Sequence, residues 1–376
     1  MIYLKVLSLT NEFEEERFGG AGTAATGIVY MLDRLGMEQT VVVPRSDWNK
    51  PGRLARGQHI NVLGLPRNIY YFGHLEMVWA DALRHKFPEL LQKWDVIHLQ
   101  AINFAPLAYL LSEGRIPILY SVYSFLREEL GDPKVPGLQE QFKIQEELLK
   151  HCHRIHLISQ SEVHYLAEHF PQYLSKAEKL ALGISLPTER WNQVNTNNRF
   201  LYVGRLLEYK GLEDLIEAVG RVYRTERQIC LDIVGKGPAP YEKYLKRMVS
   251  SLKLGDCVQF HGWQPSLEVK QRMVHAMALI IPSRREAFGL VALEGMAIGT
   301  PLISSSAGGL AELVSPTGAL TFEAGNINQL SEALMTAIDN PSLLKLFSER
   351  ARERVLSYAW EQLAPLYLNL LENLTQ

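Results

Sequence analysis

The sequence predicts an α/β protein with two doubly wound domains, each a parallel sheet with helices on both faces. Three observations lead to this prediction. The chain has 376 residues, which is enough for two domains of ordinary size. Short apolar runs alternate with helical stretches in both halves, as in a parallel sheet covered by helices. A polar stretch at 192–199, NQVNTNNR, separates the halves and lacks apolar periodicity.

The first half opens like a Rossmann unit. The apolar run KVLSLT at 5–10 predicts a strand, Gly19, Gly20 and Gly22 predict a loop, and 23–35 has helical composition. We expect further strands at 39–44, 60–65, 94–100, 116–123 and 154–161, with helices over 74–92, 103–113 and 137–151.

The same alternation restarts after the polar stretch. We expect strands within 200–205, 229–237, 258–262, 278–283 and 300–306, with helices at 211–223, 241–255, 268–277, 290–298 and 326–339. A last apolar-striped helix, WEQLAPLYLNLLENL, is long enough to pack back across a domain boundary. The predicted domains are therefore 1–190, 191–355 and a returning helix at 356–376. Two such domains would face a cleft at the carboxyl ends of their strands.

Composition argues against several classes of partner and site. Apolar residues make up 47% of the chain, and the formal net charge of −2 makes nucleic acid an unlikely partner. A local basic face, hidden in this total, would still be able to meet an anionic membrane or ligand. Cys152, Cys230 and Cys257 fit neither a disulfide framework nor a Cys-x-x-Cys metal site, so we expect free thiols. Without a secretory signal or a bilayer-length apolar run, we expect a cytoplasmic protein, with a peripheral position at the inner membrane face left open.

The candidate chemistry begins at Glu286, Ala287, Phe288 and Gly289, between a predicted strand and a predicted helix. The first amides of a helix have no partner inside it, and its dipole adds partial positive charge there, so this turn suits a phosphate. Glu294 follows about one turn later and is placed to accept ribose hydroxyls. Glu286 would accept hydroxyls of a second sugar. This arrangement suggests a sugar–diphosphate–ribose–base ligand.

Cations are expected near such a ligand. Arg205 ends a predicted strand and Lys210 opens the next helix, so both would project from the carboxyl edge of the sheet. A third strand–glycine–helix corner, SSSAGGLAEL, brings Gly308 and Gly309 to the same edge, where they would admit backbone close to the ligand.

These motifs together resemble a known family. GRLLEYKG at 204–211 and REAFGLVALEGMAIGTPLISSSAGGLAEL at 285–313 resemble the retaining glycosyltransferases of the GT-B fold, family 4, also called glycosyl transferases group 1. Their Glu-x7-Glu signature matches Glu286 and Glu294. The resemblance is strong over about 200–325 and weaker in the first half. There, FGG at 18–20 resembles the family's glycine loop, and the segment from Trp360 resembles its C-terminal helix.

The resemblance implies specific roles. Arg205 and Lys210 would hold the donor diphosphate, with Glu286 on the donor sugar and Glu294 on the ribose. Further donor contacts would come from the amides of Phe288, Gly289 and Leu290 and from the loop at Gly20. It implies no metal and no cofactor other than the nucleoside-diphosphate sugar, with UDP favoured. The acceptor stays open between a glycan, a lipid carrier and a small molecule, in cell-envelope or exopolysaccharide assembly.

Competing interpretations also arise. Many relatives carry a histidine where this chain has Tyr123, and the segment LGISL at 182–186 is atypical, which favours a nucleotide-sugar-binding protein with weak or no catalysis. A dinucleotide-dependent oxidoreductase is suggested by the opening, but GGAG is not Gly-x-Gly-x-x-Gly. Glu286 and Glu294 would otherwise be a helix cap and a solvated acid, and Arg205 and Lys210 surface ion-pair partners. The HCHRIH stretch at 151–156 is interpreted as packing or surface histidines.

Overall fold

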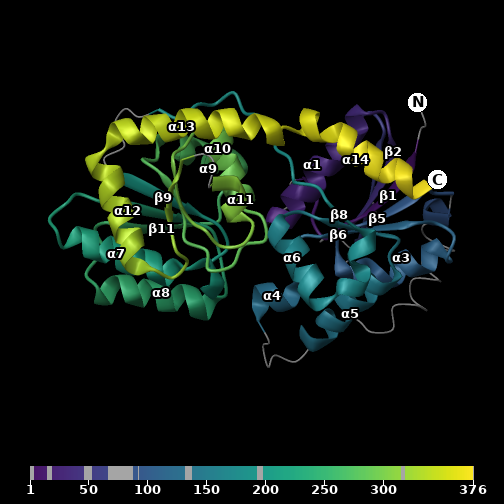
Figure 1. The fold of residues 1–376 in the computed structure, drawn as a ribbon, viewed down its shortest axis with the longest axis horizontal. Coiled ribbons are helices and arrows are strands. Elements are labelled where there is room, and N and C mark those ends of the chain that lie inside the picture. Colours follow the sequence, from purple (N-terminus) through teal and green to yellow (C-terminus); the bar gives the residue numbers. More distant parts are fainter. Residues whose placement is uncertain are drawn as a thin grey trace. The chain divides into compact units, whose positions relative to one another are not determined.

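The computed structural model describes residues 4–14, 19–45, 53–66, 88–91, 93–131, 138–192, 198–314 and 318–375. The chain divides into two compact units. Unit 1 comprises Met1–Gly183 and Trp360–Gln376, and unit 2 comprises Ile184–Ala359. Each unit has a sheet of mainly parallel strands with helices on its faces (Figure 1), so the predicted α/β class is confirmed.

Within the described residues, the sheet of unit 1 has eight strands in the order β3-β4-β2-β1-β5-β6-β7-β8. All neighbours pair in parallel except β3 and β4, which are antiparallel. The strands are β1 Lys5–Leu9, β2 Glu38–Arg45, β3 Arg53–Arg56, β4 Ile60–Pro66, β5 Val96–Leu99, β6 Ile118–Val122, β7 Arg154–Leu157 and β8 Ala177–Lys179. The edge strands β3 and β8 were not predicted, because each has only three or four residues.

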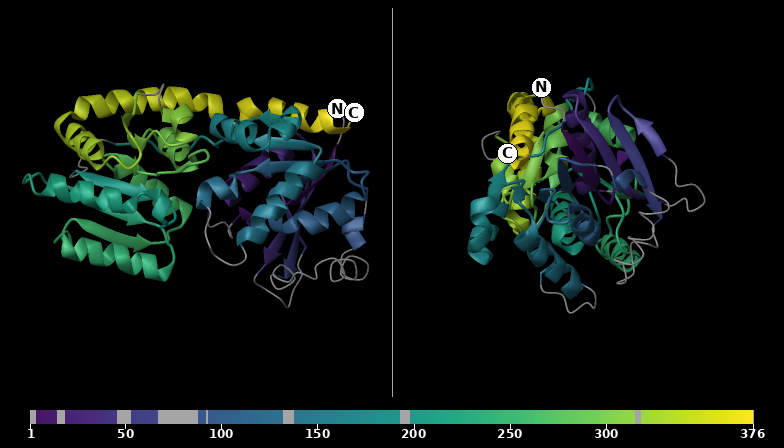
Figure 2. Two further views of the ribbon diagram at one scale, coloured as in Figure 1. Left: turned by 60° about the horizontal axis from the view of Figure 1, so that its bottom comes forward. Right: turned by 90° about the vertical axis from the view of Figure 1, so that its right-hand side faces the viewer.

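Helices cover this sheet on both sides (Figure 2). They are α1 Gly20–Arg34, α3 Ala105–Ser112, α4 Leu126–Leu130, α5 Leu138–His151, α6 Gln160–His169 and α14 Trp360–Thr375, with 3₁₀ turns η3 Pro88–Leu91, η4 Ile102–Phe104 and η5 Pro171–Lys176. Most of the helix predicted at 74–92 lies outside the described residues.

Two predicted boundaries in unit 1 are wrong. Gly20 and Gly22 belong to the first turn of α1, which the Thr23 amide closes by donating to the Gly19 carbonyl at 3.2 Å. The strand expected over 154–161 ends at Leu157. Ser159 caps α6 there, because its Oγ accepts a hydrogen bond from the Glu162 amide at 3.2 Å.

The sheet of unit 2 has six strands in the order β11-β10-β9-β12-β13-β14, and every neighbouring pair is parallel. The strands are β9 Arg199–Val203, β10 Cys230–Val234, β11 Val258–Gly262, β12 Leu279–Ile281, β13 Leu302–Ser305 and β14 Leu320–Phe322. Five were predicted, and β14 was not.

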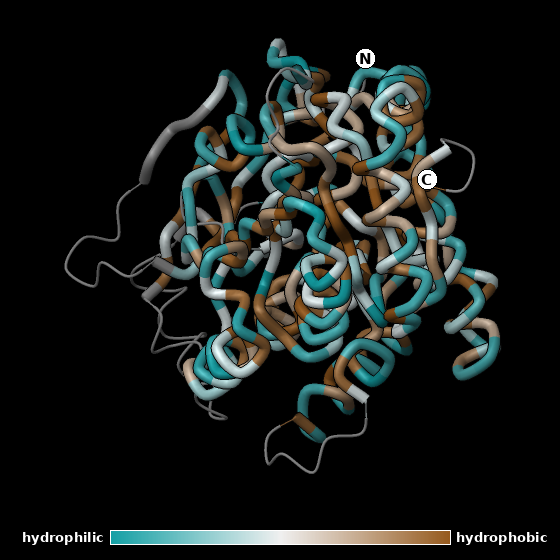
Figure 3. Tube along the Cα trace, turned by 90° about the vertical axis from the view of Figure 1, so that its left-hand side faces the viewer, coloured by the Kyte–Doolittle hydropathy of each residue, from teal (hydrophilic) through white to brown (hydrophobic). Residues whose placement is uncertain are grey.

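The helices of unit 2 are α7 Leu212–Tyr223, α8 Ala239–Ser251, α9 Ser266–His275, α10 Leu290–Ile298, α11 Leu310–Val314, α12 Ile327–Asp339 and α13 Pro341–Val355, with 3₁₀ turns η6 Glu208–Lys210 and η7 Leu356–Tyr358. The structure confirms α10 with the predicted bounds. It adds α13, which begins with a proline directly after Asn340, a common helix start. In Figure 3 hydrophilic and hydrophobic residues alternate along the helices, as burial of one helical face requires.

Other properties of the described residues bear on the sequence-based expectations. All three cysteines are free, with Cys152 and Cys257 buried. No helix of the described chain combines the length and apolar content needed to cross a bilayer.

Helix α14 belongs to unit 1 through an indole packed between two glycines. Trp360 is 5% exposed. A Cβ added to Gly27 of α1 would lie 2.3 Å from the indole, and one added to Gly183 would lie 2.4 Å from it. Neither glycine can therefore gain a methyl group unless the ring moves. This packing fixes the first turn of α14 against α1.

We predict that Gly27→Ala destabilises the protein by about 1–3 kcal/mol through overpacking. Helix propensity alone predicts the opposite sign, a gain of up to about 1 kcal/mol. Urea-induced unfolding measures the difference. Gly255→Ala is the control, because a Cβ there has nothing within 4 Å. A Gly27→Ala protein as stable as the wild type would contradict the proposed packing.

A chain of buried polar groups crosses strands β5, β6 and β7 of the unit 1 sheet. His98 Nε2 lies 2.8 Å from Ser121 Oγ, which lies 2.8 Å from His156 Nδ1. His156 Nε2 donates to the Leu180 carbonyl at 2.7 Å. Burial, aided by His156, lowers the pKa of His98 to about 3, and burial lowers that of His156 to about 4. Both rings are therefore neutral wherever the protein is folded near neutral pH.

We predict that these histidines make the protein sensitive to acid. Their unfolded pKa is 6.5. Below that pH the unfolded chain takes up protons that the folded chain cannot, so the free energy of unfolding falls until the folded pKa is reached. The slope is about 1.4 kcal/mol per pH unit for each histidine. His98→Asn should remove one such contribution between about pH 6 and 4. Parallel pH profiles of wild type and variant, from urea unfolding, would contradict this.

Candidate functional site

The rim of the unit 2 sheet contains a switch point. From β9 the chain proceeds to β10 and β11 on one side, whereas β12, β13 and β14 follow on the other side. The loops after β9 and β12 therefore leave neighbouring strands and part in opposite directions. In open parallel sheets, ligands bind in the crevice that this divergence creates at the carboxyl ends. Arg205 and Lys210 lie in the first loop, and Glu286 lies in the second.

An ion pair joins the two loops. Lys210 Nζ lies 2.8 Å from Glu286 Oε2, and each side chain is 15% exposed. Ser283 Oγ donates to the same carboxylate oxygen at 3.3 Å. The structure thus brings together two of the predicted residues, which are 76 positions apart in the sequence. The carboxylate at the start of the RREAFG turn is charge-compensated by this lysine.

Arg205 lies on the same loop, where hydrogen bonds hold both its side chain and its backbone. Its Nη2 donates to the Tyr209 hydroxyl at 2.7 Å, and its carbonyl accepts from the Tyr202 hydroxyl at 2.8 Å. Burial, and next the charge of Glu286, raise the pKa of Tyr202, so this phenol stays protonated. Lys210 Nζ lies 5.2 Å from the centre of the Tyr209 ring. The tyrosines therefore position both cations.

The start of α10 lies in the loop after β12. Gly289 caps the helix with φ of 103°, a conformation that favours glycine, and a Cβ there would lie 2.5 Å from Leu310. The first full helical hydrogen bond runs from the Leu293 amide to the Gly289 carbonyl. The amides of Leu290 and Val291 precede it. Phe288 is buried, and its ring packs edge-on against Tyr358, so only its backbone remains available to a ligand.

Glu294 occupies the one face of α10 that is not buried. Six of the nine residues in this helix are buried, and the half-exposed ones are Leu290, Val291 and Glu294. Residues three and four apart lie on one helical face, so Glu294 lies on the same face as the first turn. A ligand at the start of α10 would therefore lie on the same side of the helix as Glu294.

A third loop reaches the same region. The Gly309 amide donates to the Glu286 carbonyl at 2.9 Å. Gly308, just before it, is exposed and has φ of 51°. The glycine corner therefore supports the backbone of Glu286 directly.

A second ion pair, which the sequence analysis missed, fixes the two loops. Arg284 Nε and Nη2 donate to the two carboxylate oxygens of Asp214 at 2.9 and 2.7 Å, and its amide donates to the Tyr209 carbonyl at 2.8 Å. Asp214 is buried in the first turn of α7. Its only sequence signal was an acidic residue at a helix start, which ordinarily faces solvent.

The remaining predicted residues lie in unit 1. Gly20 is exposed at the first position of α1, and the Gly19 amide beside it donates to Glu12 Oε2 at 3.0 Å. Tyr123 follows β6, and its hydroxyl donates to Gln100 Oε1 at 2.5 Å. Burial raises its pKa.

The histidines of the 151–156 stretch have separate partners. His151 Nε2 lies 3.2 Å from Glu147, His153 Nδ1 accepts from the Ile118 amide at 3.1 Å, and His156 belongs to the buried chain described above. Among the described residues, no group of three potential ligands is placed to hold a metal ion.

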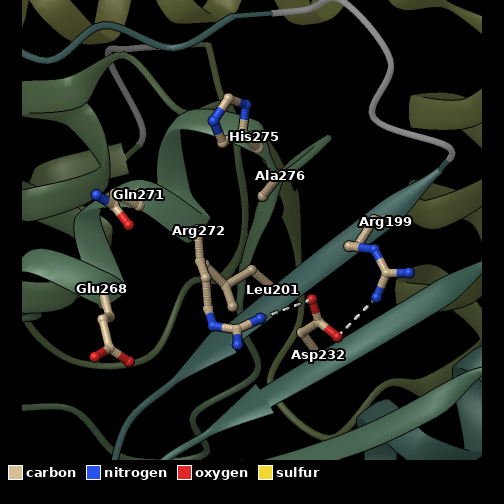
Figure 4. Close-up of a pocket in the computed structure, with 8 residues that line it drawn as sticks. All are labelled: Arg199, Leu201, Asp232, Glu268, Gln271, Arg272, His275 and Ala276. Atoms are coloured by element: carbon tan, nitrogen blue, oxygen red, sulfur yellow. Dashed lines mark hydrogen bonds and ion pairs between the residues drawn. The ribbon is translucent and has the colours of Figure 1, made fainter. Parts of the chain in front are cut away.

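Unit 2 also contains a pocket of about 490 Å³ between α9 and the face of β9 and β10. Figure 4 shows Arg199 and Arg272 approaching Asp232, at 2.8 and 3.4 Å. His261 Nε2 lies 2.9 Å from the same carboxylate. Asp232 is buried, so this network satisfies a charge that would otherwise be costly on the sheet face. The pocket is separate from the Lys210–Glu286 pair.

Comparison with known proteins agrees with this architecture. Residues 19–175 match the model for the glycosyl transferase 4-like domain, and residues 188–354 match the model for glycosyl transferases group 1. The chain is 20% identical to sucrose-phosphate synthase from Thermosynechococcus elongatus, with a TM-score of 0.82 and 99% of both chains covered. It is 18% identical to Anabaena HepE in complex with UDP and glucose, with a TM-score of 0.78, 98% of this chain and 100% of that chain being covered.

Two of the sequence relatives match over less than half of this chain. A glycogen synthase of Mycobacterium tuberculosis is 34% identical over 167 residues, which are 44% of this chain and 40% of the relative. A mannosyltransferase of Mycolicibacterium hassiacum, named as acting on MMP with α-(1→4) linkage, is 28% identical over 49% of this chain and 45% of the relative. The matched region thus spans less than half the length of either relative.

Fold and comparisons define the class: the chain has the fold of the GT-B glycosyltransferases. In particular, unit 1 matches the model for the glycosyl transferase 4-like domain and unit 2 matches the model for glycosyl transferases group 1.

We predict that the Asp214–Arg284 pair stabilises unit 2. A cycle of Asp214→Asn, Arg284→Gln and the double variant should give a coupling of about 1–2 kcal/mol in urea unfolding. Asp214 is buried and the contact is bidentate, although the Arg284 side chain is 44% exposed.

The Arg227–Asp339 pair is the control. Its side chains are 36% and 50% exposed, so its coupling should stay below about 1 kcal/mol. Equal coupling energies for the two pairs would show that Asp214 does not fix the loops.

Proposed function

We propose that this protein is a retaining glycosyltransferase that moves a sugar from a UDP-sugar to an acceptor, with the donor bound at the rim of unit 2. The Lys210–Glu286 pair carries the proposal. It places one cation and one carboxylate at the switch point, beside the start of α10. Those are the groups that a diphosphate and a sugar hydroxyl require.

In the proposed complex the diphosphate lies against the first amides of α10, between Arg205 and Lys210. Lys210 then exchanges its contact with Glu286 for one with phosphate, and Glu286 turns to the donor sugar hydroxyls. The exchange keeps the lysine paired, because the phosphate replaces the carboxylate as the anion near it, and the sugar hydroxyls donate hydrogen bonds to the released carboxylate. Glu294, one turn into the helix, accepts the ribose hydroxyls.

Catalysis in this proposal is stabilisation of charge. As the bond between the anomeric carbon and the phosphate oxygen breaks, negative charge grows on the diphosphate, and Arg205, Lys210 and the helix amides stabilise it. The acceptor hydroxyl attacks from the same face, its proton passes to the leaving phosphate oxygen, and the anomeric configuration is retained. The binding of both substrates supplies their orientation.

UDP is the proposed donor nucleotide, and a solved structure supports it: Anabaena HepE binds UDP and glucose on a similar fold. The proposed acceptor is a glycan, a lipid-linked sugar or a small hydroxylated molecule, in cell-envelope or exopolysaccharide biosynthesis. Gly20, at the start of α1, is proposed as a further diphosphate contact.

One observation favours a second function, a nucleotide-sugar-binding protein with little or no catalysis. The Tyr123 hydroxyl already donates to Gln100, and burial keeps it protonated, so it offers no base. Donor binding without sugar transfer to any acceptor class would favour this alternative.

We predict that substitutions of the two partners differ in their effect on UDP affinity: one weakens UDP binding and the other does not. Lys210→Gln should weaken UDP binding about tenfold or more, because a charged hydrogen bond contributes about 1.5–3 kcal/mol. Glu286→Gln should leave UDP binding unchanged or tighter, because it frees Lys210 for phosphate, while abolishing sugar transfer. Isothermal titration with UDP and assay of UDP release from UDP-sugars measure the two effects.

Arg227→Gln is the matched control, since it removes a cation away from this rim. The double variant Lys210→Gln/Glu286→Gln leaves neither charge of the pair behind. It therefore shows whether the effect of a single variant comes only from an unpaired charge that unfolds the site. Wild-type UDP affinity in both the Lys210 variant and an Arg205→Gln variant would refute the proposed donor site. If instead UDP fails to bind but GDP or ADP binds, only the choice of base is wrong.

A further inference from the structure

Helix α8 of unit 2 exposes a dense group of cations. Lys243, Lys246 and Arg247 are all exposed, within five consecutive residues. The helix has one acidic residue, Glu242, which is half-buried and accepts a hydrogen bond from the Gly237 amide at 2.8 Å. The exposed charge of α8 is therefore entirely positive, in a chain whose formal net charge is −2.

The cations continue beyond both ends of the helix. Lys236 precedes it and Lys253 follows it, and both are exposed. Across 236–256, all of which the structure describes, Asp256 is the only exposed acidic residue. This stretch accordingly presents five exposed basic side chains against one acid.

Aromatic rings accompany these cations. Tyr244 is 52% exposed and stacks on Tyr241, with the ring centres 6.1 Å apart. Lys246 Nζ lies 5.7 Å from the centre of the Phe260 ring, on the edge strand β11. An exposed tyrosine beside lysines is suited to the boundary between lipid headgroups and water, because its ring is apolar and its hydroxyl is polar.

The buried side of α8 explains why these residues face outward. Leu245 and Val249 belong to the core of unit 2. Lys243 and Arg247 are four apart and occupy the opposite face, with Tyr244 and Lys246 at its margins. Figures 1 and 2 show α8 as an outer helix of unit 2.

We propose that Lys243, Tyr244, Lys246 and Arg247, here called the α8 surface, bind an anionic lipid surface. The aromatic residue favours a membrane over a soluble polyanion, because a polyanion needs only the charges. The α8 helix begins directly after the loop that ends β10, so its first turn lies at the carboxyl rim of the sheet. The interaction goes beyond the proposed function, since it requires neither donor nor transfer.

Sedimentation with lipid vesicles tests this proposal. Wild type should bind vesicles containing about a third phosphatidylglycerol and should not bind pure phosphatidylcholine vesicles, and binding should fall between about 0.05 and 0.5 M NaCl. Each basic residue contributes roughly a fivefold factor, so Lys243→Gln/Lys246→Gln/Arg247→Gln should weaken binding by about a hundredfold.

The control Lys143→Gln/Lys150→Gln/Lys345→Gln removes the same charge from exposed positions on α5 and α13. It should bind vesicles like wild type. Tyr244→Ser separates the ligand classes: it should weaken vesicle binding while leaving binding to dextran sulfate unchanged. Equal loss in the two triple variants, wild-type binding by the α8 variant, or binding to dextran sulfate without binding to vesicles would each overturn the proposal. None of these outcomes depends on UDP binding.

Discussion

The organisation of unit 2 depends on one constraint: β9 and β12 are neighbours whose chains continue in opposite directions. A helix that follows one strand cannot cover the end of the other, so the rim between them stays uncovered by regular structure. The loops must then satisfy their own polar groups. They do so with the Lys210–Glu286 pair and with backbone hydrogen bonds, such as that from Arg284 to the Tyr209 carbonyl. The same divergence that opens a ligand site also explains why charged side chains gather there.

Two ion pairs bridge these loops, and their chemistry differs. Asp214 is bound by both arms of the Arg284 guanidinium and is buried at the base of α7, so exchanging it for a ligand would leave a carboxylate without compensation. Lys210 reaches Glu286 through one flexible side chain and one oxygen. A lysine can move to a new anion with little geometric penalty, whereas a bidentate arginine cannot. We therefore assign the first pair to support and, within the proposed function, the second to the exchangeable contact.

The sequence predicted those features that depend on local chemistry. Helix α10 was placed correctly because Gly289 marks its start and the apolar run after Gly289 forms the helix itself. Features that depend on distant partners were missed. Nothing near Asp214 indicates that its partner lies 70 residues later, and short edge strands such as β8 carry too few residues for a periodic signal. The loop expected at Gly20 and Gly22 proved helical because an amide–carbonyl bond to Gly19 outweighs the low helix propensity of glycine.

Two groups of cations in unit 2, at the rim and on α8, would select ligands differently. At the rim, Lys210 and Arg205 already have polar partners, so a ligand binds only if it replaces those contacts with equivalent geometry. Selectivity there comes from shape, and because Lys210 and Glu286 are each only 15% exposed, salt should affect the contact between them little. On α8 the cations are solvated, and attraction follows charge density instead of any single geometry. The proposed diphosphate site and the proposed lipid surface can thus coexist in one small domain, because the Lys210–Glu286 pair is largely buried whereas the α8 cations are solvated.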